Sequence, residues 1–416
     1  MGTSGCRAML IDTAEQVVAT SAVTMPAPRR DGPTVEQDPQ LWWDALAACV
    51  RRLAEQSPLA AVQRLALDAT SGTVLLCDGT ATPLAPALMY NDSRAQSEAA
   101  AIAGRAPTTT AAQGASSGLA KLLWLQGQPY AQGARWLMHQ ADWLAARLTG
   151  RCGLSDSNNA LKTGYDPVAG RWPGWLDTLD VRTEWLPEVQ APGRAVGTLR
   201  PEVAARLGLP AEAQLVAGTT DSTAAFLATG AAMPGEAATS LGSTLVLKVI
   251  APTPVFAPQF GVYSQPLGEA WLVGGGSNSG GAVLRHYFTD AQMEELTARL
   301  QPERSTGLDY YPLLQPGERF PICDPALAPR LEPRPAEPAE FFQGLLEGIA
   351  RIEQTGYLRL ADLGAPYPAS VRSVGGGARN PAWTLIRQRM LGVPLLAPRH
   401  HEAAFGAALL ALRQGV

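Results

Sequence analysis

The sequence predicts an α/β protein of about two domains, and three observations support this prediction. The chain has 416 residues, which is more than one simple hydrophobic core usually organises. Hydrophobic residues make up 46% of the chain and charged residues only 17%, as in compact folded proteins rather than disordered chains. Short apolar runs of strand character alternate with longer segments of helical periodicity, and this alternation indicates layers of helices on sheets.

The first half of the chain opens with a predicted β-hairpin over 8–12 and 15–19. An amphipathic helix is expected over 37–56, where Trp42, Trp43, Leu46 and Val50 recur at helical spacing. The remaining predictions in this half are strands over 64–68 and 73–79, helices over 119–126, 140–148 and 201–207, and a loop rich in proline and glycine over 187–198.

The second half of the chain starts with a predicted strand over 215–218 that leads to Asp221 and a helix over 223–230. Two proline-rich segments, 251–258 and 312–338, are expected to be ordered surface loops. The other predicted elements are strands over 244–249 and 371–374 and helices over 341–361, 381–390 and 402–412.

Three glycine-rich turns carry the strongest functional signal. They are Gly2-Thr3-Ser4-Gly5, Leu241-Gly242-Ser243-Thr244 and Gly375-Gly376-Gly377-Ala378. Glycine lets the backbone approach phosphate closely, and serine and threonine hydroxyls add donors. An acid, Asp221, lies between the first two turns, where it is suited to deprotonate a group that accepts a phosphoryl group. Any one of these turns alone would more often be an ordinary turn.

Charge and composition argue against several classes of function. The net charge is −4 and there is no basic stripe, so nucleic acid is not an expected partner. The five cysteines are scattered and the four histidines lack metal-type spacing, so we expect reduced thiols and assign no metal site to the histidines. No apolar run could span a bilayer and no signal peptide is recognisable, so we expect no membrane association and a cytoplasmic location.

The ordered set of motifs resembles the FGGY family of carbohydrate kinases, over essentially the whole chain from Gly2 to Leu412. The resemblance implies two actin-like, ribonuclease-H-like ATPase domains with a cleft between them, which we place at 1–232 and 233–416. It also implies ATP and Mg²⁺ as cofactors and a small-molecule sugar as substrate. Besides the glycine-rich turns, the landmarks are Thr70-Ser71-Gly72, Tyr90 to Ala95, Lys121 to Leu125, Asp142-Trp143-Leu144, Asp156 to Ala160 and Ala217 to Asp221.

Within this family the sequence motifs of this chain are most similar to those of the D-ribulose kinases of cyanobacteria and plants. The segment from Thr70 to Cys77 departs from the xylulose kinases, which carry a Gln and a His just after the Ser-Gly. The ribulose-kinase motifs are also similar to four further segments of this chain, 217–222, 240–244, 307–313 and 317–322. The resemblance therefore implies conversion of D-ribulose to D-ribulose 5-phosphate, with D-xylulose, L-ribulose or a polyol as alternative substrates.

The resemblance makes Asp221 the catalytic base, and the alternative is that it caps the helix that follows. It makes two of the glycine-rich turns phosphate loops and the third an adenosine-binding segment. Trp383 is expected either to flank the adenine or to lie in the core. The residues implied for the nucleotide are Thr3, Ser4, Gly5, Gly242, Ser243, Thr244, Gly376, Gly377, Asn380 and Trp383.

For the sugar, the resemblance implies contacts from Ser71, Asp92, Arg94 and Asp221. Asp92 and Arg94 could equally form an exposed salt bridge. Asn158 and Asn159 lie in a stretch that the family often uses for domain packing. The residues that hold Mg²⁺ are left open, as is the oligomeric state.

One departure from the family pattern concerns the amino end. Family members begin with an apolar strand that ends in Asp-x-Gly-Thr, whereas here Met1 directly precedes Gly2. We therefore expect the first strand of the N-terminal domain to be missing, the true start of the gene to lie upstream, and this chain to be impaired as a kinase. The alternative to an enzyme is a protein that binds nucleotide or sugar without catalysing phosphoryl transfer.

Overall fold

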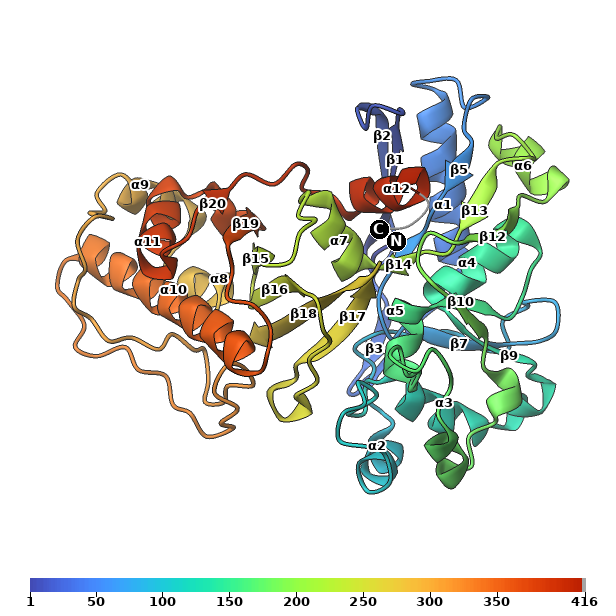
Figure 1. Ribbon diagram of the computed structural model, residues 1–416, viewed down its shortest axis with the longest axis horizontal. Coiled ribbons are helices and arrows are strands. Elements are labelled where there is room, and N and C mark those ends of the chain that lie inside the picture. Colours follow the sequence, from blue (N-terminus) through green and yellow to red (C-terminus); the bar gives the residue numbers. More distant parts are fainter. Residues whose placement is uncertain (414–416) are drawn as a thin grey trace. The chain divides into compact units, whose positions relative to one another are not determined.

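The computed structural model describes residues 1–413 and separates into two compact units (Figure 1). Unit 1 holds residues 1–228 and 265–269 and the chain from Glu402 onward, and unit 2 holds 229–264 and 270–401. The first boundary lies close to the expected division at 232/233. The last helix, α12 (Ala403–Arg413), belongs to unit 1 because it packs on α7 (Asp221–Ala228). Gly406 permits this contact, since a Cβ there would lie 1.9 Å from the Ala224 carbonyl oxygen.

The chain of unit 1 begins with an antiparallel hairpin that is covered by a helix. Strands β1 (Gly5–Ile11) and β2 (Val17–Thr24) pair with each other, and α1 (Pro39–Ala54) packs against both. The α1 helix begins after Asp38, whose side chain accepts a hydrogen bond from the Gln40 amide at 2.9 Å. Its apolar stripe, including Trp42 and Trp43, is buried.

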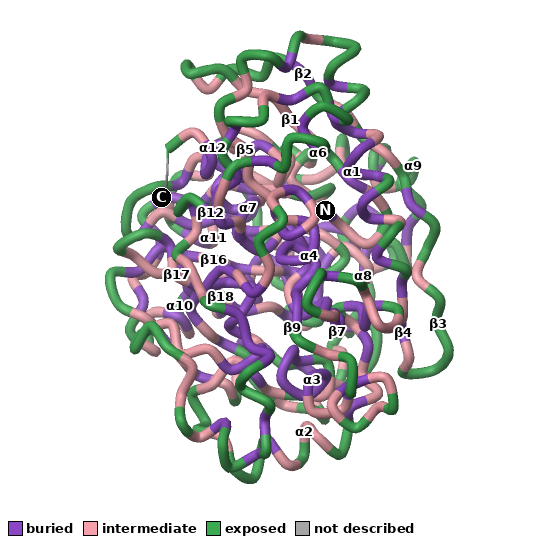
Figure 2. Tube along the Cα trace, turned by 90° about the vertical axis from the view of Figure 1, so that its right-hand side faces the viewer, coloured by how far each residue is buried: buried purple, intermediate pink, exposed green. Residues whose placement is uncertain are grey.

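A five-stranded sheet forms the other large layer of unit 1, in the order β3-β4-β8-β7-β9. Every residue of β7 is buried, and Figure 2 shows β7 and β9 in the interior. The strands are β3 (Arg29–Asp31), β4 (Thr34–Gln37), β8 (Ala87–Leu88), β7 (Val74–Cys77) and β9 (Trp136–His139).

Shorter sheets complete unit 1 and carry the chain toward Asp221. One has the order β12-β13-β5, a second joins β14 to β6, and a third joins β10 to β11. Their bounds are β5 (Arg64–Leu65), β6 (Asp68–Ala69), β10 (Leu154–Asp156), β11 (Glu188–Gln190), β12 (Ala195–Thr198), β13 (Gln214–Val216) and β14 (Thr219–Thr220).

Three of the remaining helices of unit 1 correspond to those predicted over 119–126, 140–148 and 201–207. The helix α4 ends at Gly150, which has the left-handed conformation that glycine adopts readily. The bounds are α2 (Gln96–Ala103), α3 (Gly118–Gln126), α4 (Gln140–Thr149), α5 (Ser157–Ala160) and α6 (Pro201–Leu207), with 3₁₀ turns at 129–133, 161–163, 174–179 and 183–185.

Unit 2 is built on a mixed sheet in the order β17-β18-β16-β15-β19-β20. Its β15 and β19 run parallel, whereas β15, β16 and β18 are antiparallel neighbours. The strands are β15 (Glu236–Leu241), β16 (Leu245–Ala251), β17 (Tyr263–Leu267), β18 (Ala270–Ser277), β19 (Ser370–Val374) and β20 (Leu395–Leu396).

The long helix of unit 2, α10 (Pro338–Asp362), packs against α11 (Pro381–Leu391) and against the sheet strands β16 and β18. Its apolar face, from Phe341 to Leu360, forms the centre of the unit's core. The other helices are α8 (Gly281–Tyr287) and α9 (Asp290–Thr297), with 3₁₀ turns at 258–260 and 376–379.

The predicted helices and strands largely agree with these elements, and one prediction is wrong. The segment 187–198 was expected to be loop, yet it contains β11 and β12. Each of these strands pairs with a partner distant in sequence, β10 and β13, and a local composition of proline and glycine does not reveal such a pairing. Residues 312–337 contain no helix or named strand, as expected, and α10 begins at the last residue of the predicted loop, Pro338.

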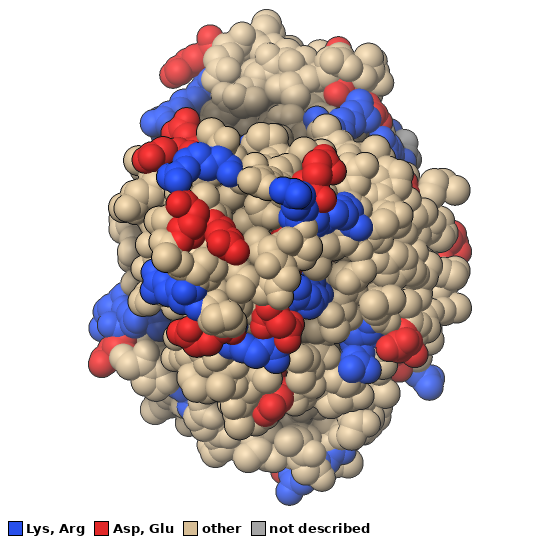
Figure 3. Space-filling view, turned by 90° about the vertical axis from the view of Figure 1, so that its left-hand side faces the viewer, with Lys and Arg blue, Asp and Glu red and all other residues tan. Residues whose placement is uncertain are grey.

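The surface is mixed in charge on the face shown in Figure 3, where basic and acidic side chains are interspersed. Among the helices of residues 1–413, none combines the length and hydropathy that a bilayer crossing requires.

Candidate active site

Asp221 begins α7 directly after β14, and the pairing of β14 fixes its neighbours. Thr219 and Thr220 pair in parallel with Asp68 and Ala69 of β6. Since the carboxyl ends of parallel neighbours meet at one edge, Asp221 lies beside the turn that starts at Thr70. The Asp221 side chain is half-buried. The predicted acid and the predicted Ser71 turn are therefore neighbours in the fold.

The amino end of the chain reaches the same place. The Met1 ammonium donates to the Asp68 carbonyl oxygen at 2.7 Å and to Asp68 Oδ1 at 3.1 Å, and it is buried. Burial by itself would lower the pKa of this ammonium, but Asp68, with smaller effects from Cys6 and Asp221, raises it above its ordinary value. A fixed positive charge therefore lies close to Asp68 and within electrostatic range of Asp221.

The first predicted phosphate turn, Gly2–Gly5, comes directly after Met1 and is held by hydrogen bonds from two other segments. The Gly2 amide donates to the Gly5 carbonyl oxygen at 2.9 Å, which closes the turn. The Met25 amide donates to the Ser4 carbonyl oxygen, and Gln37 Nε2 donates to that of Thr3. The Ser4 side chain remains exposed. The turn from Gly2 to Gly5 is thus held in shape by carbonyl contacts.

Helix capping at α7 involves Thr220 as well as Asp221. Thr220 Oγ1 accepts from the Thr223 amide at 3.4 Å, which is the contact expected of a capping hydroxyl. Asp221 Oδ1 accepts from its neighbour Ser222 at 2.7 Å. The alternative role for Asp221 was to cap the helix that follows it. Thr220 makes that capping contact instead.

The Ser71 turn is fixed by two residues that the sequence prediction did not assign to the site. Gln140 Oε1 accepts from the Thr70 amide at 3.2 Å and from Thr70 Oγ1 at 2.9 Å. Lys121 Nζ donates to the Gly72 carbonyl oxygen at 2.7 Å and to the Met89 carbonyl oxygen at 2.6 Å. Gln140 and Lys121 therefore hold the turn on both sides of Ser71.

Lys121 is completely buried, and burial lowers the pKa of its amine to about 7. A neutral amine has two N–H donors, which matches the two carbonyl acceptors. The signal that could have found it is a single lysine inside the apolar run from Leu119 to Leu125. The resemblance named this run as a landmark but gave the lysine no role.

Asp92 and Arg94 form an ion pair in which Asp92 is buried and Arg94 is partly buried, rather than the exposed pair that was considered. Arg94 contacts both oxygens of Asp92 through Nε, and its Nη2 lies 2.7 Å from Asp92 Oδ2 and 2.8 Å from Glu36 Oε1. Asp92 is fully buried and also accepts from the Val35 amide at 2.6 Å. Its carboxylate is saturated by protein donors, and the Asp92 backbone N–H donates to the Met89 carbonyl oxygen that Lys121 also contacts.

Asn158 joins the site network from α5. Its Nδ2 donates to Thr219 Oγ1 at 2.9 Å and to the Pro266 carbonyl oxygen at 3.2 Å. Asp156 Oδ1 caps α5 by accepting from the Asn158 and Asn159 amides. Burial raises the pKa of Asp156 to about 6 despite those hydrogen bonds. Asn158 therefore supports the β14 strand that carries Asp221.

In unit 2, the predicted second phosphate turn is the hairpin between β15 and β16. Leu241 pairs with Leu245, so Gly242, Ser243 and Thr244 form the tip. The Gly242 carbonyl oxygen accepts from the Gly281 amide at 2.9 Å, and Ser243 Oγ accepts from Arg285 Nη2 at 2.9 Å. The side chains of Ser243 and Thr244 are exposed.

The third glycine cluster lies beside this hairpin because β15 and β19 run parallel. Ser240 pairs with Val374, so the two loops leave neighbouring strand ends. Gly375 has φ +87°, and a Cβ there would lie 2.8 Å from the Leu241 carbonyl oxygen. The predicted nucleotide-binding residues of unit 2 therefore gather at one edge of one sheet.

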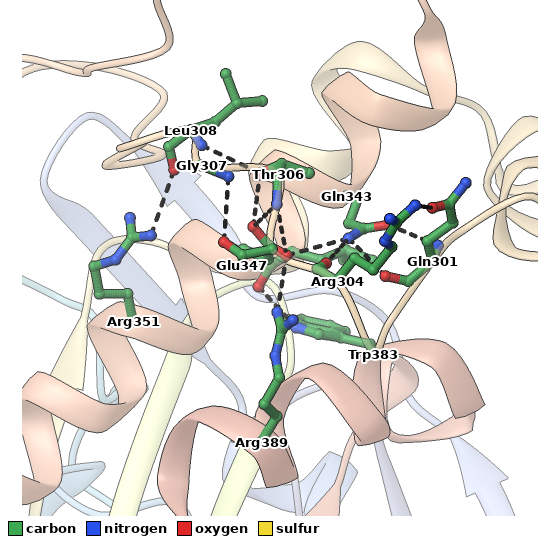
Figure 4. Close-up of polar contacts among 12 residues, drawn as sticks. Gln301, Arg304, Thr306, Gly307, Leu308, Gln343, Glu347, Arg351, Trp383 and Arg389 are labelled. Atoms are coloured by element: carbon green, nitrogen blue, oxygen red, sulfur yellow. Dashed lines mark hydrogen bonds and ion pairs between the residues drawn. The ribbon is translucent and has the colours of Figure 1, made fainter.

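Two residues assigned to the nucleotide have other partners. Trp383 is 2% exposed and donates from Nε1 to the Leu346 carbonyl oxygen at 3.1 Å, so it lies in the core. Asn380 caps α11 through the Trp383 amide and donates to Thr297 Oγ1. Figure 4 shows the side chain of Arg389, which bonds Glu347 Oε1 at 2.9 Å. That carboxylate also accepts from Thr306, which anchors the 301–308 loop.

Within residues 1–413, no three His, Cys, Asp or Glu side chains form a cluster that could hold a metal ion alone. Magnesium in phosphoryl-transfer enzymes usually needs only one or two carboxylates beside the substrate phosphates. Asp68, in β6 two residues before Thr70, is the carboxylate that fits that smaller requirement.

Comparison with known proteins identifies the class to which this fold belongs. The structure matches a crystal structure of a xyloylose kinase from Brucella ovis with a TM-score of 0.90 and 28% identity, covering 100% of this chain and 90% of that one. A glycerol kinase from Plasmodium falciparum has the same fold, with a TM-score of 0.86 at 17% identity, covering 100% of this chain and 88% of that one. The fold is thus the two-domain α/β fold found in carbohydrate kinases of known structure.

The chain belongs to the FGGY family of carbohydrate kinases. Residues 1–228 match the N-terminal domain of that family, and residues 237–415 match its C-terminal domain. The chain is 27% identical over 403 residues to the xylulose kinase of Escherichia coli K12, which covers 92% of this chain and 82% of that protein. It is also 27% identical to the autoinducer-2 kinase of Yersinia enterocolitica, covering 99% of this chain and 84% of that protein.

Proposed function

We propose that this protein transfers the γ-phosphoryl group of ATP to D-ribulose and forms D-ribulose 5-phosphate in the cytoplasm. The observation that supports this most is the meeting of Asp221, the Ser71 turn and the Gly2–Gly5 turn around the ends of β14 and β6. A carboxylate beside a hydroxyl-bearing turn is suited to bind and deprotonate a sugar alcohol.

In the proposed reaction, the distal hydroxyl oxygen of the sugar attacks the γ-phosphorus in line with the leaving ADP. The new O–P bond forms as the bond between the γ-phosphorus and the β,γ-bridging oxygen breaks. Asp221 accepts the hydroxyl proton, and Ser71 orients the sugar by hydrogen bonding. The exposed residues Ser4, Ser243 and Thr244 are the candidates that bind the triphosphate.

Magnesium that arrives with ATP would neutralise the phosphate charge, and Asp68 is our candidate for the carboxylate that would hold it. Gln140 and Lys121 keep the Ser71 turn in place during the reaction.

A second candidate substrate is D-xylulose, because the relatives from Escherichia coli and Brucella ovis are named as kinases of that sugar. Against it, the segment from Thr70 to Cys77 lacks the Gln and His of the xylulose kinases. L-ribulose and polyols are further candidates, since no residue in the site distinguishes them from D-ribulose. A protein that binds these ligands without turnover is the remaining alternative.

An ADP-release assay with a panel of D-ribulose, D-xylulose, L-ribulose and glycerol tests the proposal. We expect kcat/KM for D-ribulose to exceed that for D-xylulose at least about tenfold, because a misplaced hydroxyl leaves a hydrogen-bonding group unpaired. A preference for D-xylulose would contradict the sugar assignment alone. Sugar and ATP binding by calorimetry, with no ADP release for any sugar, would contradict the catalytic role.

A further inference from the structure

Two of the five cysteines, Cys6 and Cys49, meet where β1 packs against α1. Both are buried in unit 1, with 6% and 0% of their surface exposed. Cys6 is the buried residue of β1, and Cys49 lies on the buried stripe of α1. Figure 1 shows the strand and the helix side by side. The helix therefore holds one thiol against the strand that carries the other.

The contact between the two residues involves both sulfur atoms. Cys49 Sγ donates to the Cys6 carbonyl oxygen at 3.3 Å, and this contact joins positions 43 residues apart. A second hydrogen bond joins the two thiols to each other. Sulfur atoms within hydrogen-bond reach need only small side-chain rotations to approach the disulfide bond length of about 2.05 Å.

Cys49 is the thiol that loses its proton more easily. The hydrogen bond with Cys6, helped by Ser21 and Arg52, lowers the pKa of Cys49 to about 7 against the opposing effect of burial. The same hydrogen bond and burial raise the pKa of Cys6, so its thiol keeps the proton. The pair therefore holds a thiolate that can attack an oxidant beside a thiol that can attack the oxidised sulfur.

The other cysteines have different surroundings. Burial raises the pKa of both Cys77 and Cys152, so these thiols stay protonated at neutral pH and are poor nucleophiles. Cys323 belongs to unit 2, where it is exposed and donates to the Gln259 carbonyl oxygen. The contact between Cys6 and Cys49 is thus the place in unit 1 where oxidation is favoured.

We propose that Cys6 and Cys49 are a redox modification site, at which hydrogen peroxide converts the two thiols reversibly into one disulfide. The Cys49 thiolate attacks a peroxide oxygen, the O–O bond breaks, and the departing hydroxide takes up a proton to become water. Cys6 then attacks the sulfur of the Cys49 sulfenic acid. The S–S bond forms, the S–O bond breaks, and the hydroxide leaves with the Cys6 proton as a second water. Two thiols are oxidised and one peroxide is reduced.

The disulfide should act on the Gly2–Gly5 turn, because Cys6 follows that turn directly. In the reduced protein the Gly2 amide closes the turn on the Gly5 carbonyl oxygen, and Cys49 holds the next carbonyl group, that of Cys6. Oxidation removes the Cys49 S–H donor and draws Cys6 toward α1. We expect weaker binding of ATP in the oxidised form, and this consequence rests on the proposed role of the turn as a phosphate loop.

Peptide mapping of the full chain tests the disulfide without an activity assay. Trypsin cleaves after arginine, so the two cysteines fall in separate peptides, 1–7 and 31–51, each of which holds one cysteine. After folded protein is treated with hydrogen peroxide and the remaining thiols are alkylated, we expect these two peptides to be recovered joined. Dithiothreitol should separate them. Protein unfolded in urea before treatment is the reference, and it should give much less of the joined pair because the two thiols are then apart.

Single serine variants provide the matched controls. Cys6→Ser and Cys49→Ser should each abolish the joined peptides, whereas Cys323→Ser removes the exposed thiol and should leave them unchanged. If the two buried variants do not fold, thermal unfolding of the parent is the second measurement. The oxidised protein should unfold several degrees above the reduced protein, because the new bond closes a loop in the unfolded chain.

The ADP-release assay measures the consequence for ATP. We expect the KM for ATP to rise at least about threefold on oxidation, with little change in kcat, and to return after dithiothreitol. Cys49→Ser should show no such response to peroxide. Absence of ADP release from the reduced protein with every sugar would contradict the proposed function, whereas the disulfide would still be decided by the joined peptides.

Three outcomes would overturn the proposal. Oxidation of Cys323 with peptides 1–7 and 31–51 still separate would show that the buried pair is inert. Recovery of either peptide joined to a third one would show that the thiol has another partner. Equal KM values for ATP in the fully oxidised and fully reduced protein would show that the bond does not act on the turn.

Discussion

Arg387 and Glu353 form a bidentate ion pair that is completely buried between α11 and α10. Arg387 Nε lies 2.6 Å from Glu353 Oε2, and Nη2 lies 2.7 Å from Oε1. Arg387 Nη1 also donates to Ser373 of β19, and Thr239 of β15 donates to Glu353. The pair therefore joins two helices to the two strands whose ends carry the proposed nucleotide loops.

Removing one member of this pair should be strongly destabilising. Arg387→Met leaves the Glu353 carboxylate buried without a counter-charge, and we expect a loss of about 3–5 kcal/mol in the free energy of unfolding. The double variant Arg387→Met/Glu353→Leu should recover much of that loss, because no charge then remains buried. Urea unfolding of both variants checks this. A single variant as stable as the parent would contradict the structural role of the pair.

Gly377 and Gly376 provide a matched test of packing beneath the third glycine cluster. A Cβ at Gly377 would lie 2.4 Å from Trp383 Cζ3, whereas at Gly376 it would meet nothing within 4 Å. Gly377→Ala should therefore lose about 1–3 kcal/mol of stability and raise the KM for ATP, since Trp383 cannot move easily in the core. Gly376→Ala should change stability by less than about 0.5 kcal/mol. Equal thermal unfolding temperatures for the two variants would contradict this account.

Lys121 should give the protein a distinctive dependence of stability on pH. Its pKa is about 7 in the folded state and about 10.5 in the unfolded state, so the unfolded chain binds more protons between these values. The contribution of Lys121 to the free energy of unfolding therefore increases as the pH rises from about 7 to 10. Lys121→Met removes the titrating group, so the stability of the parent minus that of the variant should increase over this range. Urea titrations at pH 6.5, 8 and 9.5 measure the difference, and a constant or falling difference would contradict it.

The contact between Gly218 and Leu67 should control where Asp221 lies. A Cβ at Gly218 would be 1.9 Å from the Leu67 carbonyl oxygen, so Gly218→Ala must displace β14 from its neighbours. We expect a loss of about 3 kcal/mol in stability and a lower kcat in the protein that remains folded. Gly79→Ala, at a site with open space around it, is the control and should behave like the parent. Normal kcat in Gly218→Ala would show that β14 does not position the site.

The sequence was sufficient to predict the features that depend on local patterns. The helical spacing of Trp42 and Trp43 predicted α1, and the small residues around Asp221 predicted a turn between a strand and a helix. The glycine-rich turns were found in the same way, because close backbone approach requires glycine at specific positions.

Partners that are distant in sequence could not be predicted in this way. Lys121 bonds carbonyl groups 49 and 32 residues away, and any residue type can supply a backbone carbonyl. Trp383 was compatible with either the adenine site or the core, and only the position of Leu346 on α10 distinguishes the two. The buried state of Asp92 likewise depends on Val35 and Glu36 of β4.

The most direct test of the proposed mechanism is the kcat of Asp221→Asn in the ADP-release assay with D-ribulose. Asparagine keeps the size of the side chain but cannot accept the hydroxyl proton, so we expect kcat to fall about 10²- to 10⁴-fold with little change in the KM for ATP. Asp177→Asn, an exposed acid of the 174–179 turn, is the control and should keep the parent rate. A kcat for Asp221→Asn within a few-fold of the parent would contradict the assignment of Asp221 as the base.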